Sequence, residues 1–286
     1  MDVGQLEREA VAMTPAEISA AGAPGSAAAG YLVLNNIAKT FVARGNSTTA
    51  LQATNLTVGQ GQFVTLVGPS GCGKSTLLNL VAGLIEPTEG TITIGGAPVR
   101  GTDRRIGYVT QADNLLPWRT LRDNVAFPLE LAGVPVTERR ERAEFWMHRV
   151  GLSGFGDAYP SELSGGMRQR GNIIRTLIYG PPVILMDEPF GPLDAQTRIV
   201  LQDLLLSIWE ESRSTVLFVT HDLSEAISLA DQVVLMGTKP GRVIRCEDVG
   251  IERPRDIFQI HEHPVYRRLY KQIWNDLGAQ VKQAVE

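Results

Sequence analysis

A glycine-rich segment directly after a short apolar run constrains the fold of this 286-residue chain more than any other feature. The run is FVTLV (Phe63–Val67), and residues 68–76 continue as GPSGCGKST. A wholly apolar run of this length predicts a strand buried on both faces, as in parallel sheets. Four apolar residues of the next segment share one helical face: Leu77, Leu80, Val81 and Leu84. The segment therefore predicts a strand, a tight loop and a helix in an α/β fold.

The loop fits the pattern G-x-x-x-x-G-K-[ST], which is typical of phosphate binding. Glycines let the main chain wrap closely around a phosphate, and the helix start directs amides and a positive dipole at it. Lys74 would supply positive charge to the β- and γ-phosphates, and the Ser75 hydroxyl suits Mg²⁺. A chance glycine-rich turn is the alternative, which the flanking strand and helix disfavour. The predicted nucleotide-binding residues are Gly68, Pro69, Ser70, Gly71, Cys72, Gly73, Lys74, Ser75 and Thr76.

A second apolar run, in VILMDEP (Val183–Pro189), ends in two carboxylates. The carboxyl ends of parallel strands share one edge of the sheet, so Asp187 and Glu188 should lie beside the phosphate loop. Asp187 would hold the water shell of Mg²⁺, and Glu188 would act as general base toward the attacking water. A solvated acidic turn would be the better interpretation if the upstream loop were missing. Together the two motifs identify a P-loop NTPase.

The remaining patterns divide the chain into regions. TVLFVTH (Thr215–His221) predicts another buried strand, and a helix precedes it with Leu201, Leu204, Leu205 and Ile208 at helical spacing. LVLNNIAKTF and ALQATNLTV alternate as strands of an antiparallel sheet with one solvated face. Residues 121–177 have helical periodicity and predict an inserted helical subdomain. Residues 1–30 are rich in Ala, Gly, Ser and Pro and predict a flexible leader before a domain at 31–286.

Composition excludes several classes of protein. The formal net charge is −4, so bulk positive charge does not favour a nucleic-acid partner. Two cysteines are too few for a disulfide framework and favour a reducing compartment. No apolar run reaches the length of about 18 residues that would predict a membrane-spanning helix. A transport role would therefore need a separate membrane protein.

The segment LSGGMRQR (Leu163–Arg170) distinguishes among P-loop NTPases. Ser164 fits a helix N-cap, and its hydroxyl with the amides of Gly165 and Gly166 could contact a further phosphate. An ordinary capped helix start is the alternative when the segment is taken alone. In its place between the two nucleotide motifs, it resembles the signature sequence of ABC ATPases. The resemblance covers about residue 31 to the end, and implies a P-loop core with a parallel sheet, an antiparallel β subdomain and a helical subdomain bearing the signature.

Four further residues match motifs of that family. Gln111 resembles the Q-loop glutamine, which reaches Mg²⁺ and the attacking water, and His221 resembles the switch histidine near the γ-phosphate. Asp194 in GPLD resembles the D-loop aspartate, and Phe41 in KTF matches the aromatic that stacks on adenine. Taken alone, His221 would be a satisfied histidine at a strand end. Phe41 has a core phenylalanine as its alternative.

The resemblance also implies an assembly. In the family, two subunits associate head to tail, and each ATP lies between Lys74, Ser75 and Asp187 of one subunit and the signature of the other. We therefore expect ATP and Mg²⁺ as cofactors, with a homodimer or a heterodimer with a close paralogue. The expected location is peripheral, at the cytoplasmic face of the inner membrane. Transmembrane permease subunits and a periplasmic or lipid-anchored solute-binding protein are the expected partners.

Two segments resemble one branch of the family, the nitrate, sulfonate and taurine import ATPases. They are QADNLLPWRTLRDNVAFPLEL (Gln111–Leu131) and RPRD (Arg253–Asp256). This branch implies import of a small anionic solute, although cargo is read by other subunits. Leu116, Pro117 and Trp118 would lie where the membrane subunit docks. The equal alternative for Trp118 is that it fills a local core.

Rival functions find less support. A non-transport ABC ATPase acting on DNA or ribosomes would carry a long coiled coil or two cassettes, and no sustained heptad repeat separates Ser75 from Leu163. A non-hydrolysing subunit is disfavoured because Lys74, Glu188 and His221 are in place. One departure from the family follows the signature, where Gly171 costs about 1 kcal/mol relative to alanine in a helix. We expect this helix to form with altered packing.

Overall fold

Two β-sheets organise the residues that the computed structural model describes, which are 30–43, 45–191, 193–238 and 240–285. The predicted leader, residues 1–30, lies outside them apart from Gly30. The smaller sheet has the order β2-β1-β4-β5 and consists of β1 (Leu32–Ala43), β2 (Asn46–Val58), β4 (Glu89–Ile94) and β5 (Ala97–Pro98). The larger sheet has the order β10-β9-β3-β8-β7-β6 and consists of β3 (Phe63–Val67), β6 (Ile106–Val109), β7 (Val183–Asp187), β8 (Thr215–Thr220), β9 (Gln232–Gly237) and β10 (Arg242–Asp248).

The larger sheet is parallel except at one edge. β3 lies at its centre between β8 and β9, β7 pairs with β8, and β6 pairs with β7, all parallel, whereas β10 is antiparallel to β9. Every residue of β3 and β8 is buried. Such strands must be covered on both faces, which explains their unbroken apolar sequences. The smaller sheet is antiparallel throughout. The predicted alternation of burial holds at the start of β1 and over residues 54–58 of β2, whereas the two strands are exposed on both faces where they join at residues 41–43 and 46–49.

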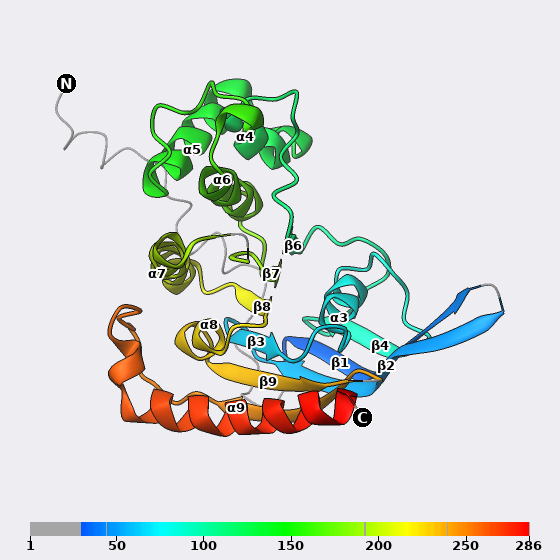
Figure 1. Cartoon of the computed structure of the whole chain (residues 1–286). Coiled ribbons are helices and arrows are strands. Elements are labelled where there is room, and N and C mark those ends of the chain that lie inside the picture. The colour runs from blue at the N-terminus through cyan, green and yellow to red at the C-terminus, as the bar shows by residue number, and fades with distance from the viewer. Residues whose placement is uncertain (1–29, 44, 192, 239, 286) are drawn as a thin grey trace. The chain divides into compact units, whose positions relative to one another are not determined.

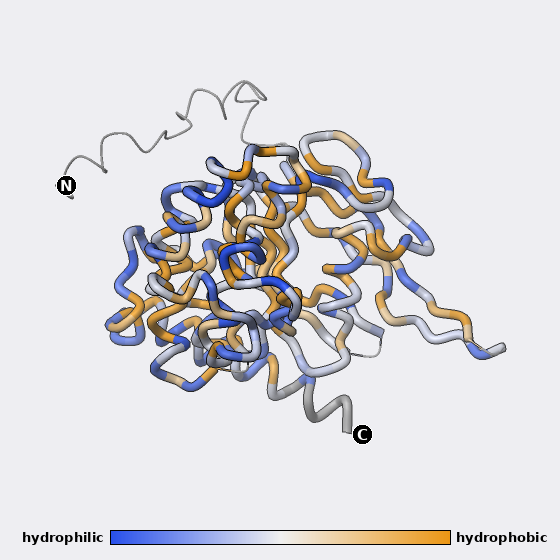
Figure 2. Tube along the Cα trace, turned by 90° about the horizontal axis from the view of Figure 1, so that it is seen from above, coloured by the Kyte–Doolittle hydropathy of each residue, from blue (hydrophilic) through white to orange (hydrophobic). Residues whose placement is uncertain are grey.

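Helices cover these sheets and form a separate group at one end (Figure 1). In chain order they are α3 (Lys74–Val81), α4 (Leu121–Leu131), α5 (Val136–Arg149), α6 (Gly165–Leu177), α7 (Ala195–Ser212), α8 (Leu223–Leu229) and α9 (Pro264–Val285), with short 3₁₀ turns at Pro160–Glu162 and Ile260–Glu262. Figure 2 shows the hydrophobic residues gathered toward the interior of the unit that begins at Tyr31. Of the helices in the described residues, none combines the length and the apolar character needed to span a bilayer.

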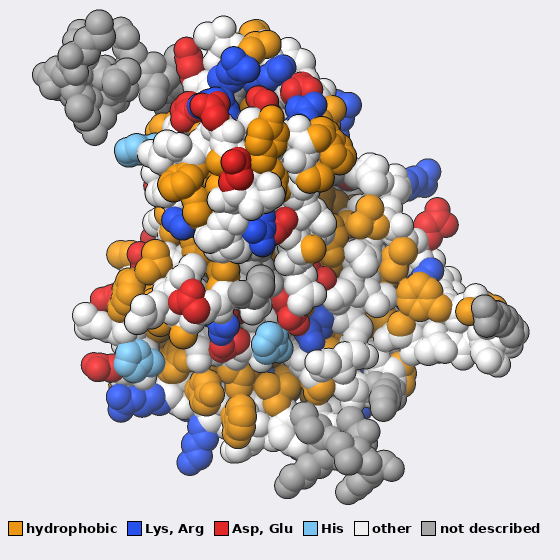
Figure 3. Space-filling view, turned by 45° about the horizontal axis from the view of Figure 1, so that its top comes forward, with side chains coloured by type: hydrophobic (Ala, Val, Ile, Leu, Met, Phe, Trp, Pro, Cys, Tyr) orange, Lys and Arg blue, Asp and Glu red, His pale blue; other side chains and the backbone are white. Residues whose placement is uncertain are grey.

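Helices α4, α5 and α6 occupy the range 121–177 and pack on one another. Ion pairs join their surfaces and loops, including Arg119 with Glu130 at 3.0 Å and Arg122 with both Glu144 and Asp157. Side chains of both charge signs accordingly gather over this region at the top of Figure 3. Exposed pairs of this kind contribute little individually, so the buried apolar faces hold the three helices together.

Two details of helix packing depart from or explain the sequence expectations. The prediction that Leu84 lies on the buried face of α3 is wrong, because the helix ends at Val81 and Leu84 is 55% exposed. Gly83 turns the chain there with a φ of 68°, and its main chain presses against Gly101 so closely that a Cβ would clash.

At Gly171 of α6, a Cβ would lie 2.7 Å from Leu121 Cδ1. The glycine thus lets α4 approach α6 at this point.

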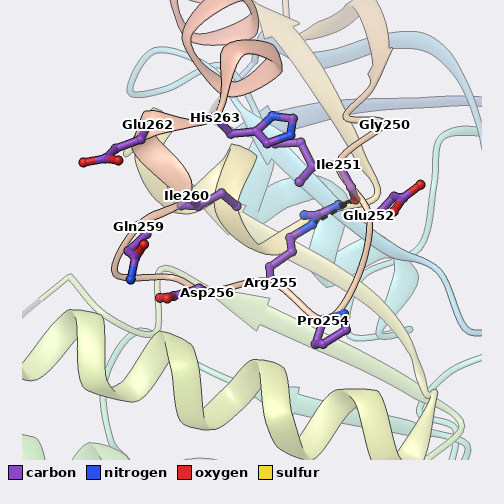
Figure 4. A pocket seen from close by; sticks show the side chains of 10 residues that line it. All are labelled: Gly250, Ile251, Glu252, Pro254, Arg255, Asp256, Gln259, Ile260, Glu262 and His263. Atoms are coloured by element: carbon purple, nitrogen blue, oxygen red, sulfur yellow. Dashed lines mark hydrogen bonds between the residues drawn. The ribbon is translucent and has the colours of Figure 1, made fainter.

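The C-terminal helix α9 packs on α8 and β9, using Tyr266, Leu269 and Ile273, which are buried. The segment before it, which holds RPRD, wraps the end of α8 through Arg255. This side chain is 8% exposed, and its guanidinium donates hydrogen bonds to the carbonyl oxygens of Ala230 (2.7 Å), Ser228 (3.1 Å) and Ile251 (3.0 Å). Arg255 is one of ten residues between 250 and 263 that line a pocket, and Figure 4 shows its side chain among them. Arg255 therefore satisfies carbonyl groups at the end of α8 that would otherwise be buried without partners.

We predict that Arg255→Met lowers the free energy of unfolding by about 3 kcal/mol, because several buried carbonyl groups lose their donor. Chemical denaturation of the full chain measures this change. The control is Arg245→Met, which should change the free energy of unfolding much less, since Arg245 pairs with Glu247 and Asp276 on the surface. Equal effects of the two substitutions would contradict the proposed role of Arg255.

Candidate functional site

The phosphate loop connects β3 to α3 and is built from close main-chain contacts. A Cβ on Gly68 would lie 2.6 Å from the carbonyl oxygen of Met236, so the position accepts only glycine without movement. Gly71 and Gly73 have φ angles of 78° and 89°, in the left-handed region that favours glycine. These three glycines make the loop close around the start of α3. Of the predicted loop residues, Ser70, Gly71 and Ser75 are exposed, Pro69, Gly73 and Thr76 are partly buried, and Gly68, Cys72 and Lys74 are buried.

Lys74 is only 7% exposed, and its ammonium group lies within the curve of the loop. The Nζ atom donates to the carbonyl oxygens of Gly68 (2.8 Å) and Pro69 (3.2 Å), and it lies 3.8 Å from Cys72 Sγ. Burial raises the pKa of the Cys72 thiol, although the charge of Lys74 opposes this shift. The thiol therefore stays neutral, and the positive charge of Lys74 is available to an anionic ligand in the loop.

Asp187 at the end of β7 faces Ser75 in the first turn of α3. Burial raises the pKa of Asp187, and the neighbouring Glu188 adds to the shift, whereas a hydrogen bond from Ser75 and the charge of Lys74 lower it. The structure thus brings together Lys74, predicted to bind the phosphates, with Ser75 and Asp187, predicted to bind the metal. A hydroxyl beside a carboxylate is a set of oxygen donors that fits a hard cation such as Mg²⁺.

Glu188, His221 and Gln111 converge although they are far apart in the sequence. Glu188 has a φ of 45°, a left-handed conformation that is uncommon for a residue other than glycine. Its Oε2 atom lies 3.1 Å from His221 Nδ1, and Gln111 Nε2 approaches the same oxygen at 3.5 Å. The first contact has hydrogen-bond length and the second is a weak one. The carboxylate is 22% exposed, so water can reach it.

The signature residues begin α6, away from the phosphate loop (Figure 1). Ser164 is the N-cap of the helix, and its hydroxyl accepts a hydrogen bond from the amide of Met167 at 3.2 Å. Ser164 and Gly165 are exposed and Gly166 is partly buried. Among the described residues, no hydrogen bond joins residues 164–166 to residues 68–76. The structure of a single chain therefore does not bring these two predicted groups together.

Phe41 and Asp194 also lie apart from the loop contacts. The Phe41 ring is 43% exposed, with Lys39 Nζ 5.1 Å from its centroid, so the alternative of a core phenylalanine is wrong. Asp194 is the N-cap of α7 and accepts hydrogen bonds from the amides of Gln196 (3.1 Å) and Thr197 (3.0 Å). Hydrogen bonds from the amide and the side chain of Thr197 lower the pKa of Asp194. As the helix cap, Asp194 has a structural role. The nucleotide contacts predicted for Phe41 and Asp194 stay predictions.

Trp118 is 72% exposed, so it does not fill a local core. It precedes Arg119, whose guanidinium stacks 4.7 Å from the Phe127 ring and pairs with Glu130. Leu116 is partly buried and Pro117 is exposed. An exposed tryptophan on an ordered segment is a candidate contact for another protein.

Sequence reasoning missed two titratable groups behind the site. The hydroxyl of Tyr108 donates to Asn79 Oδ1 at 3.1 Å, and burial together with the charge of Asp187 raises its pKa well above the usual range. Glu225 in α8 is 4% exposed, and its Oε2 accepts a hydrogen bond from Thr220 Oγ1 at 2.5 Å. Burial raises the pKa of Glu225 to about 7. No local pattern in the sequence marks Glu225, because His221 and the N-cap Asp222 precede α8 (Leu223–Leu229) and helical spacing does not relate them to it.

Comparison with known proteins agrees with this geometry. A family model described as ABC transporter matches residues 51–191. The chain is 48% identical to an uncharacterized ABC transporter ATP-binding protein of Methanocaldococcus jannaschii over 89% of this chain and 94% of that one. It is 42% identical to the aliphatic sulfonates import ATP-binding protein SsuB of Bacillus thuringiensis, covering 78% of this chain and 88% of that one. It is 48% identical to the taurine import ATP-binding protein TauB of Yersinia pestis, covering 68% and 76%.

A solved structure supports the same assignment. The chain superposes with a TM-score of 0.70 on an ATP-binding cassette that was solved as a dimer in a post-hydrolysis state with ADP and Pi. The two are 36% identical, and the match covers 77% of this chain and all of that one. The predicted fold class, an α/β P-loop NTPase core with an antiparallel β subdomain and a helical subdomain, is confirmed.

The chain belongs to the family of ABC transporter ATP-binding proteins. It is an ATPase that binds ATP, and the predicted resemblance to the sulfonate and taurine import ATPases is confirmed.

We predict that Glu225→Gln removes a pH dependence of stability. The folded-state pKa lies above the usual value of 4.5, so the folded chain binds this proton more tightly than the unfolded chain does. The native protein should therefore lose up to about 3 kcal/mol of stability from this group as the pH rises from 4.5 to about 7. Denaturation of both proteins across this range measures the difference. The exposed Glu138→Gln serves as control, and parallel curves for wild type and Glu225→Gln would contradict the prediction.

Proposed function

We propose that this chain powers the import of a small anionic solute, such as a sulfonate, taurine or nitrate, by hydrolysing ATP as a dimer. The observation that carries the hydrolytic part is the convergence of His221 and Gln111 on the carboxylate of Glu188. The names of the sulfonate and taurine relatives support import and the class of cargo. The solved dimer of a related cassette supports the assembly.

In this proposal the described residues have separate roles. Lys74 neutralises the β- and γ-phosphates, while the loop amides and the start of α3 orient them. Glu188 accepts a proton from the attacking water. His221, 3.1 Å from Glu188, orients that carboxylate and lies near the γ-phosphate. Phe41 stacks on the adenine. Because the Glu188 oxygen lies within reach of Gln111 as well, one amide can bridge the carboxylate and the metal site.

Ser75, Gln111 and Asp187 would hold Mg²⁺. Within the described residues, no group of three or more His, Cys, Asp or Glu side chains is placed to bind a metal by itself. A site that relies on one carboxylate, a hydroxyl, an amide, water and the phosphates fits these residues, because Mg²⁺ keeps several waters and binds through one or two carboxylates and substrate phosphates. When bound, the ion supplies charge stabilisation to the phosphoryl group during transfer.

The site of one chain is incomplete in this proposal. Ser164, Gly165, Gly166 and Asp194 lie at exposed helix starts and would contact the ATP that a second copy holds. The dimer would bind transmembrane permease subunits at the cytoplasmic face of the inner membrane, and a periplasmic or lipid-anchored binding protein would deliver the cargo. Trp118 would lie in the contact with the permease.

Two substitutions test the hydrolytic assignment. Lys74→Ala should lose ATP binding, because the phosphates lose their buried counter-charge. Glu188→Gln should bind ATP but turn it over at least about 100-fold more slowly, because the general base is gone. It should also accumulate as an ATP-bound dimer, which light scattering after size exclusion detects. Glu211→Gln, an exposed acid on α7, is the control. Native turnover in Glu188→Gln would remove Glu188 from the role of base.

A substitution at Trp118 tests the transport assignment. Cells that carry Trp118→Ala should lose uptake of labelled taurine or alkanesulfonate, and less of the chain should sediment with membranes, because an apolar anchor is lost. The ATP turnover of the purified chain should not change. Trp274→Ala is the matched control, since this tryptophan on α9 is 60% exposed. Native membrane association of Trp118→Ala would contradict docking at this segment.

A further inference from the structure

One guanidinium, that of Arg198, connects three segments behind the site. Arg198 lies in the first turn of α7, and its Nη2 donates to the carbonyl oxygen of Leu193 at 3.0 Å. Its Nη1 donates to Asp222 Oδ2 at 3.3 Å. Its Nε lies 3.6 Å from Glu225 Oε1 and is buried without a hydrogen-bond partner. The side chain thus joins the loop before α7 to two positions on α8.

The segment that carries His221 is held on both of its flanks. Thr220 Oγ1 accepts a hydrogen bond from the amide of Asp222 at 3.0 Å and donates to Glu225 at 2.5 Å. Asp222 Oδ1 caps α8 by accepting from the amide of Ser224 at 2.7 Å. Because both neighbours of His221 are tied to α8, the main chain that carries the imidazole is fixed to this helix start. Arg198 is the link from that helix start to the loop at Leu193.

The electrostatics make this link sensitive to small displacements. Glu225 has a side chain that is 5% exposed, and Arg198 is 27% exposed. A buried N–H group without a partner is unfavourable, because it has lost its hydrogen bonds to water. A movement of a few tenths of an ångström would convert the 3.6 Å contact into a charge-assisted hydrogen bond. The strength of the Arg198–Glu225 interaction therefore depends on the position of α7 relative to α8.

The start of α6, which carries the signature residues, also contacts the segment that Arg198 holds. A Cβ on Gly166 would lie 3.2 Å from Thr197 Cγ2 and 3.7 Å from Leu193 Cδ2, so the start of α6 packs against the segment that Arg198 holds. Contacts therefore run from the start of α6 to Leu193 directly, and from Leu193 to Asp222 through the Arg198 side chain.

We propose that Arg198 and Glu225 are positioning residues for ATP hydrolysis, which fix the segment bearing His221 relative to Leu193 and the start of α6. This inference rests on the proposed roles of Glu188 and His221, and it adds two residues that touch neither the nucleotide nor the reacting water. The raised pKa of Glu225 is consistent with its burial in this link.

The test uses the full chain with Mg-ATP and the variants Arg198→Met, Glu225→Gln and the double variant. Each single variant should lower kcat by about tenfold, because a misplaced His221 and Glu188 raise the barrier to the chemical step. The Kd for ATP should stay within about twofold of the native value, since the phosphate loop is untouched. The double variant should lose no more than about the larger single loss, because both substitutions break one link.

Two controls separate the possible outcomes. Arg149→Met removes an ion pair of α7 with α5, to Glu211 at 2.6 Å, and should leave kcat unchanged. His221→Ala should abolish turnover if the proposed function holds, and native turnover there would overturn the proposed function and this inference together. With His221→Ala inactive, a native kcat in Arg198→Met or Glu225→Gln overturns the inference alone. Additive losses in the double variant, or a parallel fall in ATP affinity, would show a structural role and overturn it as well.

Discussion

Close main-chain contacts around the phosphate loop set the position of every other group in the site. Gly68 approaches the carbonyl of Met236 at the end of β9, and Gly73 approaches the carbonyl of Ala50 in β2, where a Cβ would lie 3.0 Å away. Gly241 also lies against the carbonyls of Cys72 and Ala50, at which a Cβ would clash. The loop is therefore held between the two sheets by contacts that only glycine permits. This arrangement buries Lys74 and gives its charge a fixed place.

Parallel pairing then brings the remaining groups to the same edge. Gln111 follows β6, Asp187 and Glu188 end β7, and His221 follows β8, which lies beside β3. Because the carboxyl ends of parallel strands share an edge, residues separated by more than a hundred positions meet there. Partial burial at that edge raises the pKa of Asp187, whereas Ser75 and Lys74 oppose the shift. The edge thus holds acidic groups together only because cationic and hydroxyl groups accompany them.

The helical region is tied to this edge through arginines of α6. Arg168 pairs with Asp113 at 2.8 Å, and Arg175 donates to the carbonyl oxygen of Asn114 at 2.9 Å. Both contacts lie just after Gln111, so the signature helix is joined to the segment bearing that glutamine. Gly171 permits α4 to pack closely on the same helix, which accounts for a glycine at a position where helix propensity disfavours it.

Much of the fold could be predicted because its signals are local. Apolar runs such as FVTLV mark strands buried on both faces, and the loop pattern that follows identifies the phosphate site and the fold class together. The error at Leu84 has a physical cause, since apolar spacing continued past a point where Gly83 turns the chain. Periodicity alone does not register a left-handed glycine that lies within an apolar pattern.

The sequence by itself determined the strand–loop–helix core, the signature and the identity of the groups that carry charge. Only the tertiary structure decided which of them meet: Glu188 with His221, Arg198 with Leu193 and Asp222, and Arg255 with the end of α8. It also decided that Trp118 and Phe41 are exposed, which no local pattern distinguishes from burial. The physical reason is that burial, pKa and ion pairing depend on neighbours supplied by distant segments, whereas strand and helix patterns depend on adjacent residues.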